Sequence, residues 1–124
     1  MDIEQIRHYC LTKIGAVETQ PFDPDTLVYK VTRKQHELRM FALLSLQRPN
    51  YVTLKCDPDL SVELRDYWND DVQGAWHFNK IHWNQIRLNG ALNNNQIKQL
   101  IDHSYDLIST GKKQKLDISM LITL

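Results

Sequence analysis

Residues 26–56, TLVYKVTRKQHELRMFALLSLQRPNYVTLKC, decide the fold of this chain. Residues 26–32 and 51–56 alternate between apolar and polar side chains, which is the period of a half-buried β-strand. Residues 40–46, MFALLSL, form a continuous apolar run of strand length, although the same pattern also fits a buried helix. The polar connections between these segments are residues 33–39, expected to be a hairpin, and Arg48-Pro49-Asn50, expected to be a turn. We therefore expect three strands in series, an antiparallel meander.

Three amphipathic helices are expected around these strands. In each of them, apolar residues recur at three- and four-residue steps, which places them on one helical face. Each also begins at a typical capping residue: Asp2, Asp57 before Pro58, and Asn93 with Gln96 three positions later. The predicted helices run over residues 3–14, from Asp57 to a point before Gly74, and from Asn93 to Gly111.

Two further strands are expected at residues 75–78 and 82–88, joined around Asn79-Lys80. The tail, residues 112–124, fits either a short helix or a strand. The resulting order, α-β-β-β-α-β-β-α, predicts an α+β fold in which an antiparallel β-sheet packs against α-helices on one face. Because the sequence shows no linker and no internal repeat, residues 1–124 are expected to form a single domain.

The composition favours an ordinary soluble protein and indicates no particular class of partner. The 15 lysine and arginine residues cancel the 15 aspartate and glutamate residues, so the net charge gives no attraction to nucleic acid or to a membrane. Cys10 and Cys56 show no CxxC spacing and are expected to be buried, reduced thiols. The sequence shows neither a signal peptide nor an apolar stretch of roughly 20 residues. We therefore expect a cytoplasmic monomer that does not contact a membrane.

Five stretches carry a resemblance to a known family: PFDPDTLVYKV (21–31), MFALLSL (40–46), VTLKCDPDL (52–60), HFNKIHWNQIRLNG (77–90) and QIKQLIDHSYDLI (96–108). Together they resemble the MmcQ/YjbR family over nearly the whole chain. The most specific piece is Asn79-Lys80-x-His82-Trp83, followed by a strand and Asn89-Gly90. The resemblance implies a frataxin-like (CyaY-like) arrangement, described as a double-wing DNA-binding fold. It also implies a small bacterial cytoplasmic protein of a family labelled DNA-binding by analogy of fold.

A basic cluster lies in the first expected hairpin, where Lys30, Arg33, Lys34 and Arg39 surround a single acid, Glu37. A protruding basic hairpin suits a DNA-binding wing, because contacts to phosphates supply most of the non-specific affinity for DNA. The alternative interpretation is a solvated turn, since connecting loops lie at the surface and are commonly charged.

A second cluster follows in Asn79, Lys80, His82, Trp83 and Arg87. Here the two cations can contact phosphates, the asparagine can read a base edge and the tryptophan can stack on a base. The alternative is architectural: Trp83 belongs to the core, Asn79 bonds its own backbone in a turn, and His82 is hydrogen-bonded within the fold. The sequence favours neither interpretation over the other.

The sequence predicts no metal site, cofactor or catalytic site. His77 and His82 are five positions apart, which places them on opposite faces of a strand, and no nucleophile elbow, glycine-rich phosphate loop or carboxylate pair is present. We expect a non-enzymatic DNA-binding protein, regulatory or accessory, whose two basic hairpins lie on one face. The alternative is a protein- or small-ligand-binding module without nucleic-acid affinity, which the zero net charge and the acids around the second helix motivate.

Overall fold

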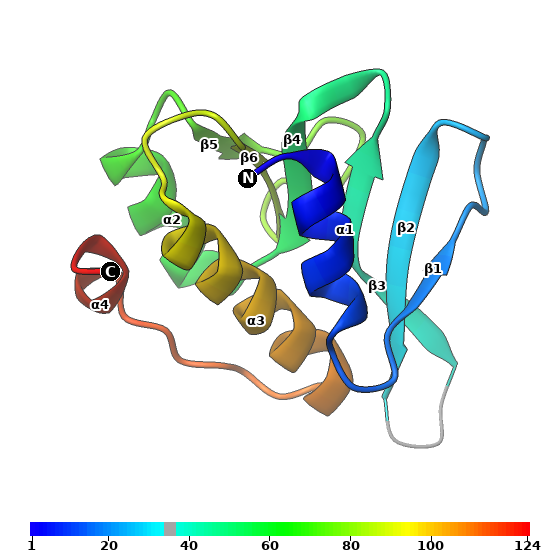
Figure 1. Cartoon of the computed structure of the whole chain (residues 1–124). Coiled ribbons are helices and arrows are strands. Elements are labelled where there is room, and N and C mark those ends of the chain that lie inside the picture. Colours follow the sequence, from blue (N-terminus) through cyan, green and yellow to red (C-terminus); the bar gives the residue numbers. More distant parts are fainter. Residues whose placement is uncertain (34–36) are drawn as a thin grey trace.

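The fold, seen in a computed structural model that describes residues 1–33 and 37–124, is a curved antiparallel sheet with helices packed against it (Figure 1). The elements, in chain order, are α1 (Ile3–Leu11), β1 (Val17–Thr19), β2 (Thr26–Thr32), β3 (Leu38–Ser45), β4 (Arg48–Lys55), α2 (Pro58–Tyr67), β5 (Val72–Gly74), β6 (Trp83–Arg87), α3 (Asn94–Thr110) and α4 (Ile118–Ile122). The strands form one six-stranded sheet in the order β1-β2-β3-β4-β6-β5, and all neighbours are antiparallel. The predicted α+β class and the meander, now β2-β3-β4, are confirmed.

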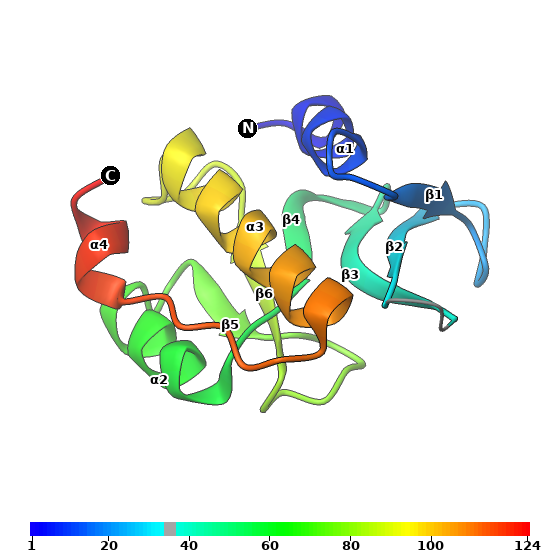
Figure 2. The ribbon, with the colours of Figure 1, turned by 90° about the horizontal axis from the view of Figure 1, so that it is seen from below.

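The hydrophobic core lies between the sheet and its helices. Helix α3 packs across β2, β3 and β4, and α1 runs beside it along the same face (Figure 2). Ile6, Phe41, Leu54 and Ile97 are fully or almost fully buried in this layer. The predicted capping box of α3 is confirmed, and Gly111 ends that helix in a left-handed conformation with φ of 67°.

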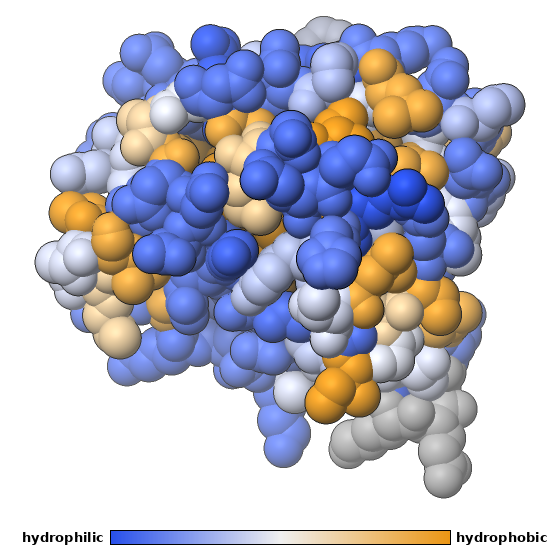
Figure 3. Space-filling view, viewed as in Figure 1, coloured by the Kyte–Doolittle hydropathy of each residue, from blue (hydrophilic) through white to orange (hydrophobic). Residues whose placement is uncertain are grey.

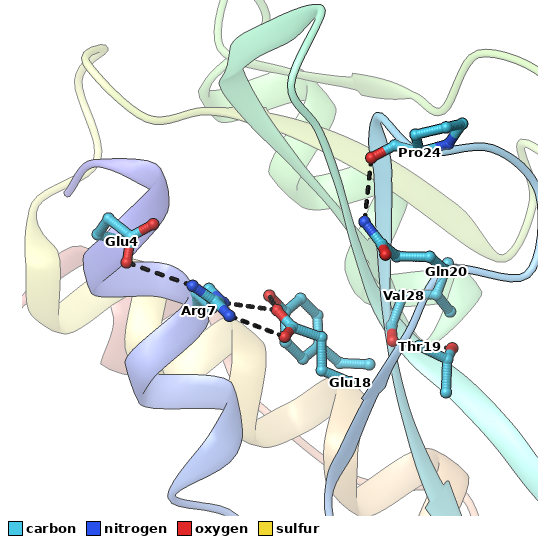
Figure 4. A network of polar contacts seen from close by, with 8 residues as sticks. Glu4, Arg7, Glu18, Thr19, Gln20, Pro24 and Val28 are labelled. Atoms are coloured by element: carbon cyan, nitrogen blue, oxygen red, sulfur yellow. Dashed lines mark hydrogen bonds and ion pairs between the residues drawn. The ribbon is translucent and has the colours of Figure 1, made fainter.

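Strand β1 lies in a segment that the sequence predicted to be a loop, residues 18–25. A tertiary contact explains the difference. The Arg7 guanidinium donates two hydrogen bonds from α1 to the Glu18 carboxylate on β1, at 2.6 and 3.0 Å (Figure 4). The Tyr29 hydroxyl, on β2, donates a third hydrogen bond to the same carboxylate at 2.7 Å. A carboxylate held by both neighbours fixes the register of this three-residue strand.

Two predicted boundaries in the first half were wrong. Helix α1 ends at Leu11 rather than at residue 14, and the Thr12 hydroxyl donates a hydrogen bond to the carbonyl of Tyr9 at 2.6 Å. The expected turn Arg48-Pro49-Asn50 is the start of β4, and Leu46 and Gln47 make the turn. Proline fits there because the pairing of β4 with β6 begins only at Tyr51, so its missing N–H removes no bond to β6.

The strand predicted at residues 75–78 was also wrong. The strand that pairs with β6 is β5, and its last ladder position is Gly74 opposite Asn84. One further bond runs from the Ala75 N–H to the Trp83 carbonyl at 2.9 Å, and the chain then leaves the sheet. His77 has φ of 69°, a left-handed conformation that a β-strand does not contain. The undecided tail contains α4, which the side chain of Asp117 caps.

Candidate functional site

One end of the sheet carries a group of cations, which we call the basic end: Arg33, Arg39 and Lys55. Arg33 follows β2, Arg39 lies on β3, and Lys55 is the last residue of β4. The pKa of Lys55 is lowered, first by partial burial of the ammonium group and then by the positive charges of Arg33 and Arg39. The fold therefore places three like charges close enough to repel one another.

A pocket of about 390 Å³ opens beside these cations. Arg33, Lys55 and His82 line it together with residues of the segment that follows α3, including Lys112 and Lys113. Arg33 is held in place because its Nε donates a hydrogen bond to the carbonyl of Ile108 at 3.2 Å. Two acids reduce the positive charge, since the Lys113 ammonium lies 3.3 Å from the Asp59 carboxylate and 3.8 Å from that of Asp57.

The motif Asn79-Lys80-x-His82-Trp83 forms the end of the loop before β6 and the first residue of that strand, and Trp83 is half-buried there rather than part of the core. The Asn79 side-chain oxygen accepts a hydrogen bond from the Ile81 N–H at 3.0 Å. Its carbonyl accepts two more, from the N–H groups of His82 and Trp83, at 3.1 and 2.9 Å. Asn79 therefore bonds its own turn, as the architectural alternative predicted.

Arg65, on α2, holds the other side of this loop and was not singled out from the sequence. Its guanidinium donates to the Asn84 side-chain oxygen at 2.7 Å, to the Trp83 carbonyl at 3.3 Å and to the Lys80 carbonyl. Asn84 is almost fully buried and donates in turn to the Ser61 hydroxyl at 3.0 Å. The signal in the sequence was that Arg65 is the one cation in a helix otherwise flanked by acids.

The second predicted cluster does not come together as one basic face. Lys55 is the register partner of Trp83 at one end of β6, whereas Arg87 is the partner of Tyr51 at the other end. The four intervening steps correspond to roughly 13 Å along the strand. The Arg87 guanidinium lies 3.6 Å from the Asp71 carboxylate, so an acid already accompanies this cation. The single face expected across both hairpins was therefore wrong for Arg87.

The remaining candidates lie in different places. Lys30 faces outward from β2 opposite Met40, and it is half-buried. Lys80 is exposed in the loop between β5 and β6, and its aliphatic carbons pack close to Gly74. His82 is half-buried at the pocket of the basic end. Lys34 lies outside the described residues.

A groove of about 450 Å³ opens on the face of the sheet opposite α3. Its floor includes Thr53 of β4 and Gln85 of β6, which are register partners and are each only 9% exposed. Its rim is aromatic: Tyr51 of β4, Phe22 from the loop before β2, and Trp76 and Phe78 from the loop before β6. Phe22 and Trp76 are 66% and 62% exposed. Sequence reasoning missed this groove because three separated segments build it.

The helix-covered side of the molecule has a different character. Its surface is mostly hydrophilic, and hydrophobic side chains gather at several separate places rather than around one hollow (Figure 3). Exposed aliphatic side chains include Ile14 near the end of α1 and Met120 on α4.

The thiols and the buried histidine serve packing. Burial raises the pKa of both Cys10 and Cys56 to about 12, which leaves these thiols protonated and unreactive at neutral pH. His103 accepts a hydrogen bond at Nε2 from the Asp57 N–H at 3.1 Å, and burial lowers its pKa. Among residues 1–33 and 37–124, no three histidine, cysteine or acidic side chains are grouped to hold a metal ion. No helix in these same ranges is long and apolar enough to cross a membrane.

These features define an α+β protein with an open antiparallel sheet, and comparison with known proteins identifies its family. The YjbR family model matches residues 11–107, and the chain belongs to the YjbR family. It is 34% identical over 106 residues to the uncharacterized protein YjbR of Escherichia coli strain K12, covering 85% of each chain.

Two crystal structures share this fold. The first is a Deinococcus radiodurans protein with a DUF419 domain: its TM-score is 0.81 at 31% identity, covering 96% of this chain and 86% of that one. The second is a Pseudomonas syringae protein, with a TM-score of 0.69 at 27% identity over 87% of this chain and 99% of that one. The predicted family is confirmed.

Proposed function

We propose that this chain is a non-enzymatic nucleic-acid-binding protein, regulatory or accessory, which contacts the phosphate backbone through its basic end. The observation that supports the proposal best is that Arg33 and Lys55 line one pocket at the end of the sheet. The pKa of Lys55 is lowered first by partial burial and then by the positive charges of Arg33 and Arg39, which is consistent with this grouping. Cations held close together destabilise one another unless an anion lies nearby. A phosphate bound among them would relieve this repulsion and release condensed counterions from the nucleic acid.

The position of the basic end supports a phosphate contact more than a base contact. Its three cations lie just after β2, near the start of β3 and at the end of β4. Lys112 and Lys113, in the segment after α3, line the pocket beside them. Together these side chains form a broad surface rather than a single projecting element. Contacts of this kind position a protein on nucleic acid but do not read sequence. We therefore expect binding that depends on salt and depends little on base sequence.

The test is fluorescence anisotropy of a labelled mixed-sequence duplex at about 50 and 200 mM salt, where a few phosphate contacts give micromolar binding that weakens steeply. The informative variant combines Arg39→Gln with Lys112→Gln, because both side chains are exposed. The matched control combines Arg87→Gln with Lys98→Gln, which removes the same charge away from the basic end. We expect only the first pair to weaken binding and to lower the salt slope by about 1–2.

Two results would contradict the proposal. One is no binding at about 100 µM protein and the lower salt concentration, because the non-specific contribution is already measurable there. The other is an equal loss of affinity in both double variants, which would show a response to net charge rather than to this surface.

A second candidate function is a small-ligand-binding module without duplex affinity. It is favoured by the groove, whose aromatic rim and polar floor are typical of a ligand site. The ion pair between Arg87 and Asp71 also favours it, because an acid accompanies a cation that was expected to contact DNA. If this protein binds a small ligand but does not bind the duplex in the anisotropy experiment, the result supports the second candidate over the first.

A further inference from the structure

We infer that the groove on the open face of the sheet binds a nucleobase, as a planar heteroaromatic ring held between aromatic side chains above a hydrogen-bonding floor. This inference concerns a different surface from the basic end and requires no duplex, and it rests on the second candidate function, whose ligand class it names. It is carried by the burial of Thr53 and Gln85, the exposure of the aromatic rim and the backbone conformation of His77.

The floor of the groove presents polar atoms that lack protein partners. Thr53 and Gln85 are both nine-tenths buried, yet among the described residues neither the hydroxyl nor the side-chain amide forms a hydrogen bond. No side-chain nitrogen or oxygen of the described residues is both sealed from solvent and without a partner, so these atoms remain accessible from the groove. Water in the groove can satisfy these atoms, and a ligand that replaces this water must offer matching donors and acceptors.

The chemistry of this floor selects among aromatic ligands. A primary amide offers both a donor and an acceptor, and a hydroxyl offers both as well. The edge of a nucleobase presents donors and acceptors side by side and can form hydrogen bonds with both the amide and the hydroxyl. A purely hydrocarbon ring would displace water and leave the amide unpaired, which costs affinity. The floor therefore favours a heteroaromatic ring over a phenyl or indole ring.

The walls of the groove suit a flat ring. Trp76 and Phe22 project from two different loops and are mostly exposed, although large aromatic side chains gain much from burial. Stacking of a base on an aromatic side chain is a common source of affinity for unpaired bases. Tyr51 closes one end, where the Arg48 guanidinium carbon lies 5.0 Å from its ring centroid. This cation lies beside the groove and can attract the phosphate that a nucleotide carries.

The loop that carries Trp76 is held in an unfavourable conformation. His77 lines the groove and has φ of 69°, a region that non-glycine residues adopt at an energetic cost. The loop keeps this conformation because Arg65 and Asn79 bond its far end. Trp76, His77 and Phe78 are consecutive in this loop and all three line the groove.

The first experiment is a titration of the ¹⁵N-labelled protein with nucleoside 5′-monophosphates, followed by NMR at the Trp76 indole N–H and the Gln85 side-chain amide. We expect saturable shifts of both signals in the range from about 10 µM to about 1 mM, typical of small ligands in open grooves. A short single-stranded oligonucleotide forms a second arm and distinguishes an unpaired base in a strand from a free nucleotide. Binding in either arm supports the inference, and the arm that binds more tightly identifies the source.

Paired variants connect the shifts to the groove. Gln85→Leu removes the hydrogen-bonding floor, and its control is Gln73→Leu, which lies opposite Gln85 on β5 but is exposed outside the groove. Trp76→Ala removes a wall, and its control is Ile81→Ala, which is 63% exposed in the same loop. We expect at least about tenfold weaker binding for each groove variant and unchanged binding for each control.

Three outcomes would overturn the inference. The first is that neither signal shifts with about 5 mM nucleotide or with the oligonucleotide. The second is that Gln85→Leu binds the nucleotides as tightly as the wild-type protein does. The third is that free indole binds as tightly as the nucleotides. Circular dichroism of each variant establishes that it is folded. Duplex anisotropy measured on Gln85→Leu separates the two hypotheses, because loss of the nucleobase site alone leaves contacts at the basic end unchanged.

Discussion

Replacing Ser104 with alanine tests whether a single buried hydroxyl holds the basic end in place. Ser104 lies on α3 and is fully buried. Its hydroxyl donates to the Phe41 carbonyl at 2.5 Å and accepts from the Lys55 N–H at 3.0 Å. It thereby bonds backbone groups of β3 and β4 beyond the last paired residues at that end, Ala42 and Leu54.

The magnitude follows from these two bonds. Ser104→Ala creates almost no cavity, but it leaves one carbonyl and one N–H without this partner. Leaving a buried polar group unsatisfied costs about 1–3 kcal/mol. Alanine regains about 0.5 kcal/mol through its higher helix propensity. For the two groups together, less this gain, the net loss is about 1.5–5.5 kcal/mol, which for a chain of this length lowers the Tm by roughly 5–22 °C.

The assay is urea denaturation followed by circular dichroism, with Ser109→Ala as the control. Ser109 lies on the same helix and is only half-buried, so its replacement should change the free energy of unfolding by less than about 0.5 kcal/mol. Hydrogen exchange at the Lys55 amide gives a local measure, and exchange there should accelerate in Ser104→Ala. Equal stability of the two variants, with unchanged exchange at Lys55, would refute the reasoning.

Three further predictions follow from particular side chains. Tyr29→Phe should lower the free energy of unfolding by about 1 kcal/mol near neutral pH. Arg7 and Tyr29 lower the folded-state pKa of Glu18, so the carboxylate stabilises the fold above its unfolded pKa and loses this effect as the pH falls through the folded value. The difference between the two proteins should therefore shrink in acid, and urea titrations at several pH values measure it; a difference that grows instead would contradict the assignment. Gly111→Ala should destabilise by about 1–2 kcal/mol, because the residue has φ of 67° and a Cβ would lie 2.7 Å from the Arg33 side chain; thermal denaturation at the wild-type Tm would disprove this. Cys10 and Cys56 should resist a thiol reagent in the native protein and react only on unfolding, so rapid native labelling at pH 8 would contradict their assignment as buried, protonated thiols.

Local patterns were sufficient to predict the elements that carry their own signal. The alternation at residues 26–32 and 51–56 predicted β2 and most of β4, because burial of one face requires a two-residue period. Asn93 and Gln96 predicted the start of α3, because their side chains bond backbone groups only three residues away. Alternation and capping depend on residues that are close in the sequence, so the structures they predict are also found in the folded protein.

Elements fixed by distant contacts could not be predicted in the same way. Strand β1 depends on Arg7, which lies on another element. The aromatic residues Trp76 and Phe78 suggested a strand because aromatic side chains are common in strands, whereas in the fold they rim a groove. Gln85 lies in the strand predicted at residues 82–88 but was not singled out; it is only 9% exposed because it lies at the bottom of the groove.

The two candidate surfaces share strands but lie at different positions along them. Because they are separated, the additivity of affinity losses can show whether they bind one ligand or two. Lys55 and Tyr51 mark the two ends on β4, roughly 13 Å apart by strand rise. Effects of substitutions more than about 10 Å apart normally add when the sites act independently. If a single strand of nucleic acid lay across both surfaces, its phosphates and bases would link the two, and losses in affinity from the Arg39 and Gln85 variants would depart from additivity. Additive losses would instead mean that the sheet carries two sites with separate ligands, one recognised by charge and the other by ring shape and hydrogen bonding.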